Sequence, residues 1–149
     1  MARNGFSLTP TAEVALSAAT AKTVVQLVAP ANIILAVNGA WVSFDGISNT
    51  AEPVIVEILR QTTAGTVTAR NPLKTKDTST ALGATGGVNA SAEPIAGDVL
   101  KTFHLHPQAG VIIPLDFDKE IEIPGGGRLG MRITAPAAVN CLAGFEGEE

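Results

Sequence analysis

The sequence predicts an all-β fold, and three observations support this prediction. The chain has 149 residues, of which 46% are hydrophobic and only 4% aromatic, so its apolar content is mainly Ala, Val, Ile and Leu. Short stretches of apolar residues recur along it, several with the two-residue period of a half-buried strand. Gly and Pro separate many of these stretches, whereas helical periodicity is hard to find. The Ala-rich residues 11–21 lie between Pro10 and a β-branched run, and we expect them to be extended.

Eight or nine short antiparallel strands follow from this pattern. The expected strands are residues 23–29, 33–44, 54–61, 66–69, 99–106, 110–115, 119–123, 128–134 and 138–145. In the strand at 54–61, Val54, Val56 and Ile58 share one face, which is typical of a strand with one buried side. Strands of this kind pack as a β-sandwich, a jelly roll or a small barrel.

The turns between these strands follow from Gly, Pro and Asn. Ala64-Gly65 predicts a hairpin between the strands at 54–61 and 66–69. Asn38-Gly39 has two readings. It forms a two-residue hairpin turn, since both residues tolerate positive φ, or Gly39 is a kink or bulge inside one long strand.

Two segments fall outside the expected strands. Residues 1–21 are predicted to be an extended N-terminal arm, followed by a single domain at 22–149 that contains a long loop at 71–98. Structureless loops of this length are uncommon in compact domains. We therefore expect both segments to become ordered on neighbouring subunits or on a partner. Their apolar residues are the candidates for these contacts: Phe6, Leu8, Pro10, Pro72, Leu73, Leu82 and Val88.

The charge of the chain excludes some partners. It has 10 Lys and Arg against 14 Asp and Glu, a net charge of -4, and the acidic residues concentrate in the C-terminal third. Without a basic cluster we expect neither nucleic acid nor an anionic membrane as a partner. The longest apolar stretch, residues 24–37, is too short to span a bilayer. No signal peptide is visible, so we expect synthesis in a cytoplasm.

His104 and His106 are the clearest candidates for chemistry. Residues two apart on a strand project from one face, so two imidazoles there could share a metal ion. The positions that would supply a carboxylate hold Gly110 and Val111, and the chain has no third His. We therefore predict no metal site and no cofactor, with both His on a solvent or inter-subunit face.

The remaining candidates also point away from catalysis. No Gly-x-Ser-x-Gly elbow presents a nucleophile, and the Gly-rich turn at 124–128 lacks the Lys-Ser/Thr pair of a phosphate loop. Cys141 lies in an apolar run and is predicted to be a buried structural thiol. Trp41 is predicted to anchor the core or the space between two sheets. The alternating acidic residues are expected on the wet face of a strand: Asp116, Asp118, Glu120 and Glu122.

Two stretches carry a resemblance to a known family. One is WVSFDG at 41–46 with AEPVIVEILRQTTAGT at 51–66, and the other is HPQ at 106–108 with GGGRLGMRITAPAAVN at 125–140. Together they resemble the jelly-roll capsid decoration, or cement, proteins encoded among the head genes of tailed bacteriophages. The resemblance covers about residues 30–145 and includes no catalytic signature.

The resemblance implies a structural virion protein without enzymatic activity. Such a protein is made in the cytoplasm of the bacterial host and sits on the outer capsid surface. It implies a homotrimer at or near local three-fold axes that bridges subunits of the major capsid protein and stabilises the capsid. It also favours one continuous strand through Asn38-Gly39.

Two alternatives belong to other classes. A receptor- or carbohydrate-binding head domain of a phage fibre would need an exposed aromatic patch, and the chain offers five Phe, one Trp and no Tyr. A cupin-like metal-binding enzyme would have to use His104 and His106.

Overall fold

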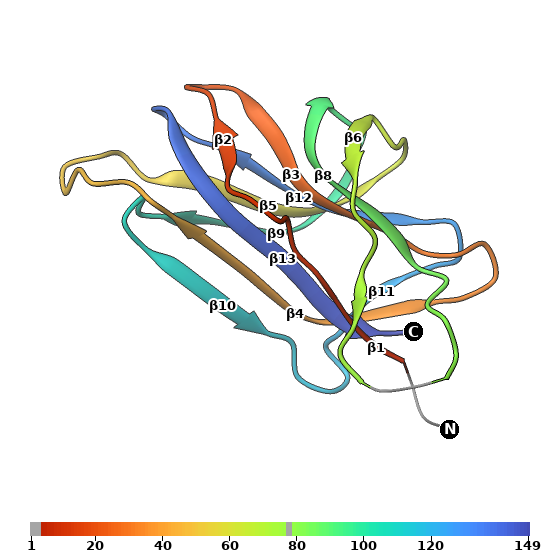
Figure 1. Ribbon diagram of the computed structural model, residues 1–149. Coiled ribbons are helices and arrows are strands. Elements are labelled where there is room, and N and C mark those ends of the chain that lie inside the picture. Colours follow the sequence, from red (N-terminus) through yellow and green to blue (C-terminus); the bar gives the residue numbers. More distant parts are fainter. Residues whose placement is uncertain (1–3, 77–78) are drawn as a thin grey trace.

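The computed structural model describes residues 4–76 and 79–149, and these form two antiparallel β-sheets packed face to face (Figure 1). No helix occurs in the described residues. These residues therefore contain no helix that is long and apolar enough to cross a membrane. The predicted fold class is confirmed as an all-β sandwich. The strands are β1 (Gly5–Leu8), β2 (Val14–Leu16), β3 (Ala21–Val28), β4 (Leu35–Phe44), β5 (Val54–Gln61), β6 (Thr66–Ala69), β7 (Leu73–Lys74), β8 (Thr85–Ala92), β9 (Ala96–Leu105), β10 (Gly110–Pro114), β11 (Ile121–Ile123), β12 (Arg128–Thr134) and β13 (Val139–Glu148).

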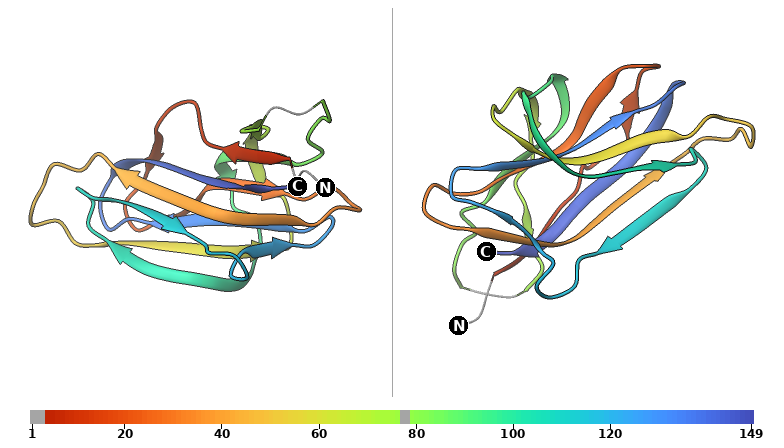
Figure 2. Two further views of the ribbon diagram at one scale, coloured as in Figure 1. Left: turned by 90° about the horizontal axis from the view of Figure 1, so that it is seen from below. Right: turned by 180° about the vertical axis from the view of Figure 1, so that it is seen from behind.

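The strands divide between two sheets, which appear as two layers when the molecule is seen from below (Figure 2, left). Sheet A has the order β10-β4-β13-β1-β7, with β11 also paired to β4 and β2 to β13. Sheet B has the order β6-β8-β3-β12-β5-β9. Every pairing is antiparallel. The core fills the space between the sheets.

The core is aliphatic, as the composition predicts. Alternate residues of the central strands point inward, because successive side chains of a strand face opposite sides of its sheet. Burial of this apolar surface is the main stabilising contribution to a fold of this size. The largest side chains of the core cluster are Phe6, Leu8, Leu27, Leu35, Ile58, Ile123, Leu129, Met131, Ile133 and Phe145.

Strand β4 runs without interruption through Asn38-Gly39. Val37 pairs with Gly147 and Gly39 pairs with Glu146, which leaves Asn38 as an extra residue between two ladder positions. The alternative of a bulge in one long strand is therefore correct, and the hairpin is wrong. A side chain at position 39 would overlap the side chain of Glu146 as it lies in this structure.

The predicted N-terminal arm is wrong for the described part of residues 1–21. Strands β1 and β2 both pair with β13 of the same chain, with Leu8 opposite Phe145 and Val14 opposite Cys141. The side chains of Phe6 and Leu8 are completely buried. The segment is part of the sandwich because Phe6 and Leu8, like Val14 and Leu16, place two apolar side chains on one face of a very short strand.

The predicted long loop at 71–98 is also wrong for the parts of this segment that form strands. It contains β7, β8 and the beginning of β9, although residues 77 and 78 lie outside the described part. Strand β8 extends sheet B, with Val88 opposite Val25 of β3. Its Gly86 and Gly87 are needed for packing, since a side chain at position 87 would overlap Val67. These glycines also remove the alternation by which a strand is recognised in a sequence.

Candidate functional site

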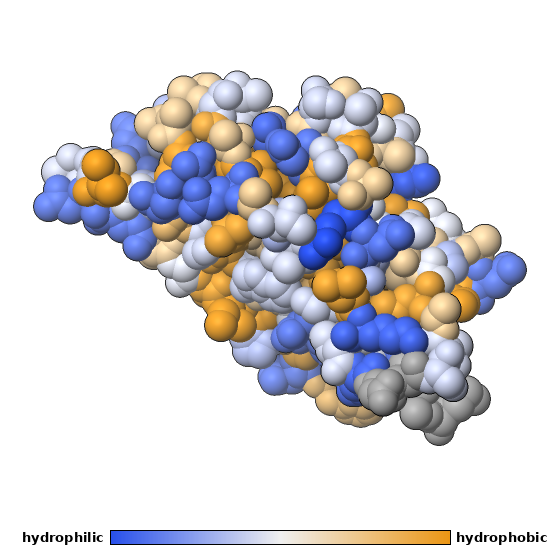
Figure 3. Space-filling model, in the orientation of Figure 1, coloured by the Kyte–Doolittle hydropathy of each residue, from blue (hydrophilic) through white to orange (hydrophobic). Residues whose placement is uncertain are grey.

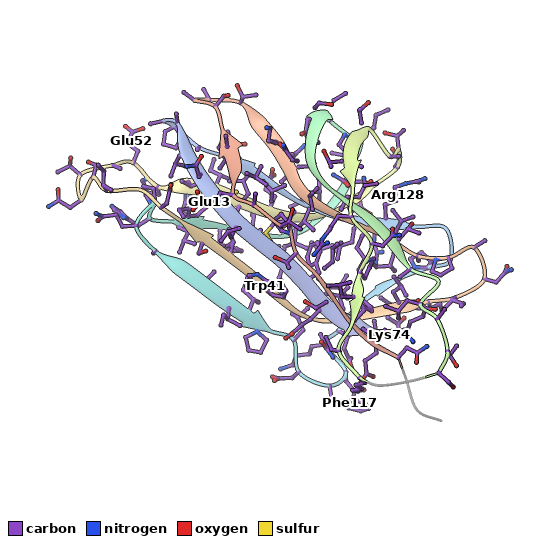
Figure 4. The ribbon with its side chains drawn as sticks, viewed as in Figure 1. Glu13, Trp41, Glu52, Lys74, Phe117 and Arg128 are labelled. Atoms are coloured by element: carbon purple, nitrogen blue, oxygen red, sulfur yellow. The ribbon has the colours of Figure 1, made fainter. Side chains whose placement is uncertain are left out.

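An apolar surface covers part of the outer face of sheet A. The register aligns Ile112 of β10 with Trp41 of β4, and Trp41 with Gly144 of β13. Ile112 is 76% exposed and Leu142 is 38% exposed, while the indole of Trp41 is half-buried. Pro114 on the same edge strand is exposed. We call the surface formed by Trp41, Ile112, Pro114 and Leu142 the Trp41 face. Trp41 is labelled in Figure 4, and Figure 3 shows the same side of the molecule as a space-filling view.

The predicted core position of Trp41 is wrong. Its ring lies on the outside of sheet A over Gly144, where a side chain would overlap the indole. The neighbouring Ala40 and Val42 point into the core, with only 1% exposure each. The sheet beneath the indole holds it in place, so the face is preorganised.

A pocket of about 730 Å³ adjoins this face at one end of the sandwich. It is lined by strand β2 and by three connections, namely those between β4 and β5, β9 and β10, and β12 and β13. The buried side chains of Leu16 and Val54 belong to its lining, and Ile47, which is 94% exposed, contributes from the β4–β5 connection. That connection projects from the body of the molecule, with Glu52 labelled on it in Figure 4.

Asp45 fixes the base of the projecting connection. Its Oδ1 accepts a hydrogen bond from the backbone N–H of Asn140 at 2.9 Å, and its Oδ2 accepts one from Nδ2 of Asn140 at 2.8 Å. These bonds favour the ionised carboxylate, first through the side chain and then through the backbone of Asn140, and lower the pKa of Asp45 below its ordinary value. The adjacent Gly46 N–H donates to the carbonyl of Pro107 at 2.8 Å.

The pocket and the Trp41 face form one continuous surface. Asn140 lines the pocket, and Leu142, two residues further along β13, lies on the Trp41 face. Residues two apart on a strand point to the same side. The sequence gives no signal for the pocket, because Asp45 and Asn140 are 95 positions apart. The sequence also gives no signal that Ile112 is exposed, because the run Val111-Ile112-Ile113 has no alternation of apolar and polar residues.

The two histidines do not form a metal centre with other described residues. His104 is exposed on β9, opposite Ile55. Strand β9 ends at Leu105, and Nδ1 of His106 accepts a hydrogen bond at 3.2 Å from the N–H of Gln108 in the following turn. Within residues 4–76 and 79–149, no group of three His, Cys, Asp or Glu side chains could hold a metal ion.

The predicted row of carboxylates is interrupted by a turn. The N–H of Lys119 donates to the carbonyl of Asp116, and Asp118 has a φ of 68°, so β11 comprises only Ile121–Ile123. Glu122 alone of the four lies on this strand. The turn leaves Phe117 81% exposed, and Figure 4 labels this side chain at the edge of the molecule.

Most of the predicted contact residues are not at the surface. The structure buries Phe6, Leu8, Pro10, Pro72 and Val88 within the chain itself. Leu82 is partly buried against the core, and Leu73 remains 58% exposed on β7. The predicted burial of the thiol is confirmed: Cys141 is 1% exposed, and burial raises its pKa to about 12, which keeps it protonated at neutral pH.

Comparison of the chain with protein families, with curated proteins and with solved structures finds no match.

Proposed function

We propose that this chain is a capsid decoration, or cement, protein of a tailed bacteriophage, and that it binds the major capsid protein through the Trp41 face. The observation that carries the proposal is an apolar face on the outside of sheet A, in which Pro114 is exposed and Leu142 is 38% exposed. Ile112 exposes 76% of its surface beside the half-buried Trp41. Contiguous exposed apolar patches mark interaction surfaces, and aromatic side chains at their centre dominate the binding energy.

The strand connectivity supports a jelly roll, the fold that the resemblance implies. The first strands pair with the last in nested order: β1 and β2 with β13, β3 with β12, β4 with β10 and β11, and β5 with β9. A long hairpin wrapped into two sheets has this order, and wrapping then brings β13 beside β4 and β12 beside β5. Strands β6, β7 and β8 are an insertion at the tip of that hairpin.

Cementing follows from binding that is specific for the assembled shell. A protein that binds the lattice but not its separated subunits stabilises the lattice by mass action. Because the Trp41 face is held by backbone hydrogen bonds of a sheet, little conformational entropy is lost on docking. We further propose a homotrimer, since three linked copies multiply weak contacts into slow dissociation. A net charge of -4 suits the outer capsid surface better than contact with packaged DNA.

The test compares two isoleucine substitutions on opposite outer faces. Ile112→Ser removes an exposed side chain from the Trp41 face, and Ile55→Ser removes one that is 38% exposed on sheet B. Purified protein is cosedimented with expanded capsids of the phage that encodes it. We expect Ile112→Ser to weaken binding by about tenfold or more and Ile55→Ser to bind like the wild type.

Three outcomes would contradict the proposal. The wild-type protein could fail to cosediment with capsids, the two variants could bind equally well, or the protein could adsorb to host cells instead of capsids. The last result would favour the head domain of a phage fibre.

A further inference from the structure

The pocket beside the Trp41 face has the size and lining of a binding site. Its volume of about 730 Å³ lies within the range of roughly 300–1,000 Å³ that is typical of ligand pockets. Leu16 and Val54 are 2% and 1% exposed, so the lining reaches the core. The small exposed residues 136–138 line it from the β12–β13 turn. An aliphatic side chain of a partner would find an apolar environment there.

The charges of the lining are all of one sign. Asp45 and Glu52 line the pocket, and no Lys or Arg does so. Asp45 stays ionised because Asn140 donates one hydrogen bond to each carboxylate oxygen, and each oxygen keeps a second lone pair as an acceptor. Glu52 is exposed and forms no ion pair with the described residues. A cationic side chain of a partner placed above the pocket would therefore meet two carboxylates and no Lys or Arg of the lining that would repel it.

The base of the pocket is held by hydrogen bonds before any ligand binds. The carboxylate of Asp45 accepts a hydrogen bond from Asn140 of β13, and the N–H of Gly46 donates one to the carbonyl of Pro107. A side chain at position 46 would overlap that carbonyl. Pro107 and Pro136 restrict the backbone of two of the surrounding connections. Binding to such a site costs little ordering entropy.

From this geometry we infer that the pocket receives an extended segment of the capsid partner in which an aliphatic side chain stands beside a Lys or Arg. The identity of the partner rests on the function proposed above; the chemistry of the segment rests on the pocket. The segment continues onto the Trp41 face, because Asn140 and Leu142 lie on the same side of β13.

The experiment uses the isolated full-length protein and two short peptides. The acetylated and amidated peptides Ala-Leu-Lys-Leu-Ala and Ala-Leu-Glu-Leu-Ala are titrated into ¹⁵N-labelled protein. We expect the Lys peptide to shift amide signals of residues 45–52 and 137–140. We expect it to bind about fivefold to tenfold more tightly than the Glu peptide, because an attraction replaces a repulsion at a partly exposed site.

Two variants and a control locate the effect. Glu52→Gln should reduce the preference for the Lys peptide, and Ala138→Trp should fill the pocket and abolish binding of both peptides. Glu122→Gln, which removes an exposed carboxylate on β11, should change neither result. The spectrum of each variant without peptide shows whether it is folded.

The inference is wrong if neither peptide shifts the pocket signals, if both bind equally well, or if the shifts are confined to β4 and β10. Self-association of the wild type that Ala138→Trp removes would assign the pocket to a second copy and overturn the inference. The peptide assay needs no capsid, so it separates the pocket from the proposed function. Loss of capsid binding in Ile112→Ser tests the function, and loss of peptide binding in Ala138→Trp tests the pocket.

Discussion

The outer faces of the two sheets differ in their polarity and in how far the rest of the chain covers them. On sheet B, Gln26 and Gln61 point outward and yet are only 1% and 5% exposed. Nε2 of Gln26 donates to Oε1 of Gln61 at 2.6 Å, and Nε2 of Gln61 donates to Oγ1 of Thr23 at 2.9 Å. Thr23 in turn donates to Glu93 through its hydroxyl at 2.7 Å. The connection between β5 and β6 lies over this network, where the Thr63 carbonyl accepts a hydrogen bond from Gln26 at 3.5 Å.

Sheet A has the opposite arrangement. Its outer face presents Trp41, Ile112 and Leu142 instead of amides, with Ile112 76% and Leu142 38% exposed. Sheet A lies in front in Figure 1, and sheet B lies in front in the right-hand view of Figure 2, where the molecule is seen from behind. On sheet B the covered region is polar and hydrogen-bonded, and Ile55 and Val99 on β5 and β9 are 38% and 45% exposed, whereas Ile112 on sheet A is 76% exposed. This difference is the physical reason to look for the binding partner on sheet A.

The largest expected effect concerns the inner face of sheet A, which packs in the core, unlike the outer face. Phe6→Ala should lower the free energy of unfolding by about 3–5 kcal/mol, because it leaves a cavity under a completely buried ring. Chemical denaturation measures this change. For the same reason, deletion of residues 1–20 should prevent folding. A deletion variant that stays folded would restore the interpretation of this segment as an arm.

The position of Trp41 shows how far the sequence predicts this surface. The strand and its glycine were predictable from β-branched residues, but the side of the sheet on which Trp41 lies was not. Leu35 and Val37 point inward before the bulge, and Ala40 and Val42 point inward after it. The bulge at Asn38 changes the phase; if residues 35–44 alternated regularly, Trp41 would share the inward phase of Val37.

The short strands show a second limit of the same kind. Strands β1, β2 and β7 are too short for periodicity to be recognised, and they exist because each pairs with a strand distant in the sequence. Pairing between distant segments has no local signal. The all-β class was therefore predictable from composition and alternation, while the burial of the expected contact residues was not.

The second effect concerns the covered network on sheet B. Gln61→Leu removes the acceptor of Gln26 and the donor to Thr23. Leaving buried polar groups without partners costs about 1–3 kcal/mol of stability. Thermal or chemical unfolding should show this loss, and Thr68→Ala on the exposed strand β6 serves as the control. An unchanged stability of Gln61→Leu would mean that water enters the network, and the outer faces would then differ less than described.

A smaller effect is expected for the open face of sheet A. Ile112→Ser should change the free energy of unfolding by no more than about 0.5 kcal/mol, because its side chain is mostly in water already. Fluorescence of a dye that binds exposed apolar surface should nevertheless fall in this variant and hardly change in Ile55→Ser. Equal dye binding by both variants would remove the distinction between the two faces.

The smallest expected effect lies where the Trp41 face meets the pocket, at the exposed carboxylate of Asp45. Asn140 lowers the pKa of this group in the folded protein, so its stabilising contribution is present above the unfolded pKa and is lost as the pH falls through the folded one. The midpoint of thermal unfolding should therefore be lower in Asp45→Asn than in the wild type at neutral pH. The difference should fade below about pH 4, near the ordinary pKa of aspartate. In the wild type, the Asn140 amide signal should shift over the same pH range as the base of the β4–β5 connection loosens. If the difference between the two proteins did not depend on pH, the carboxylate would not hold this connection, and the pocket would lack the fixed wall on which its binding of a partner segment depends.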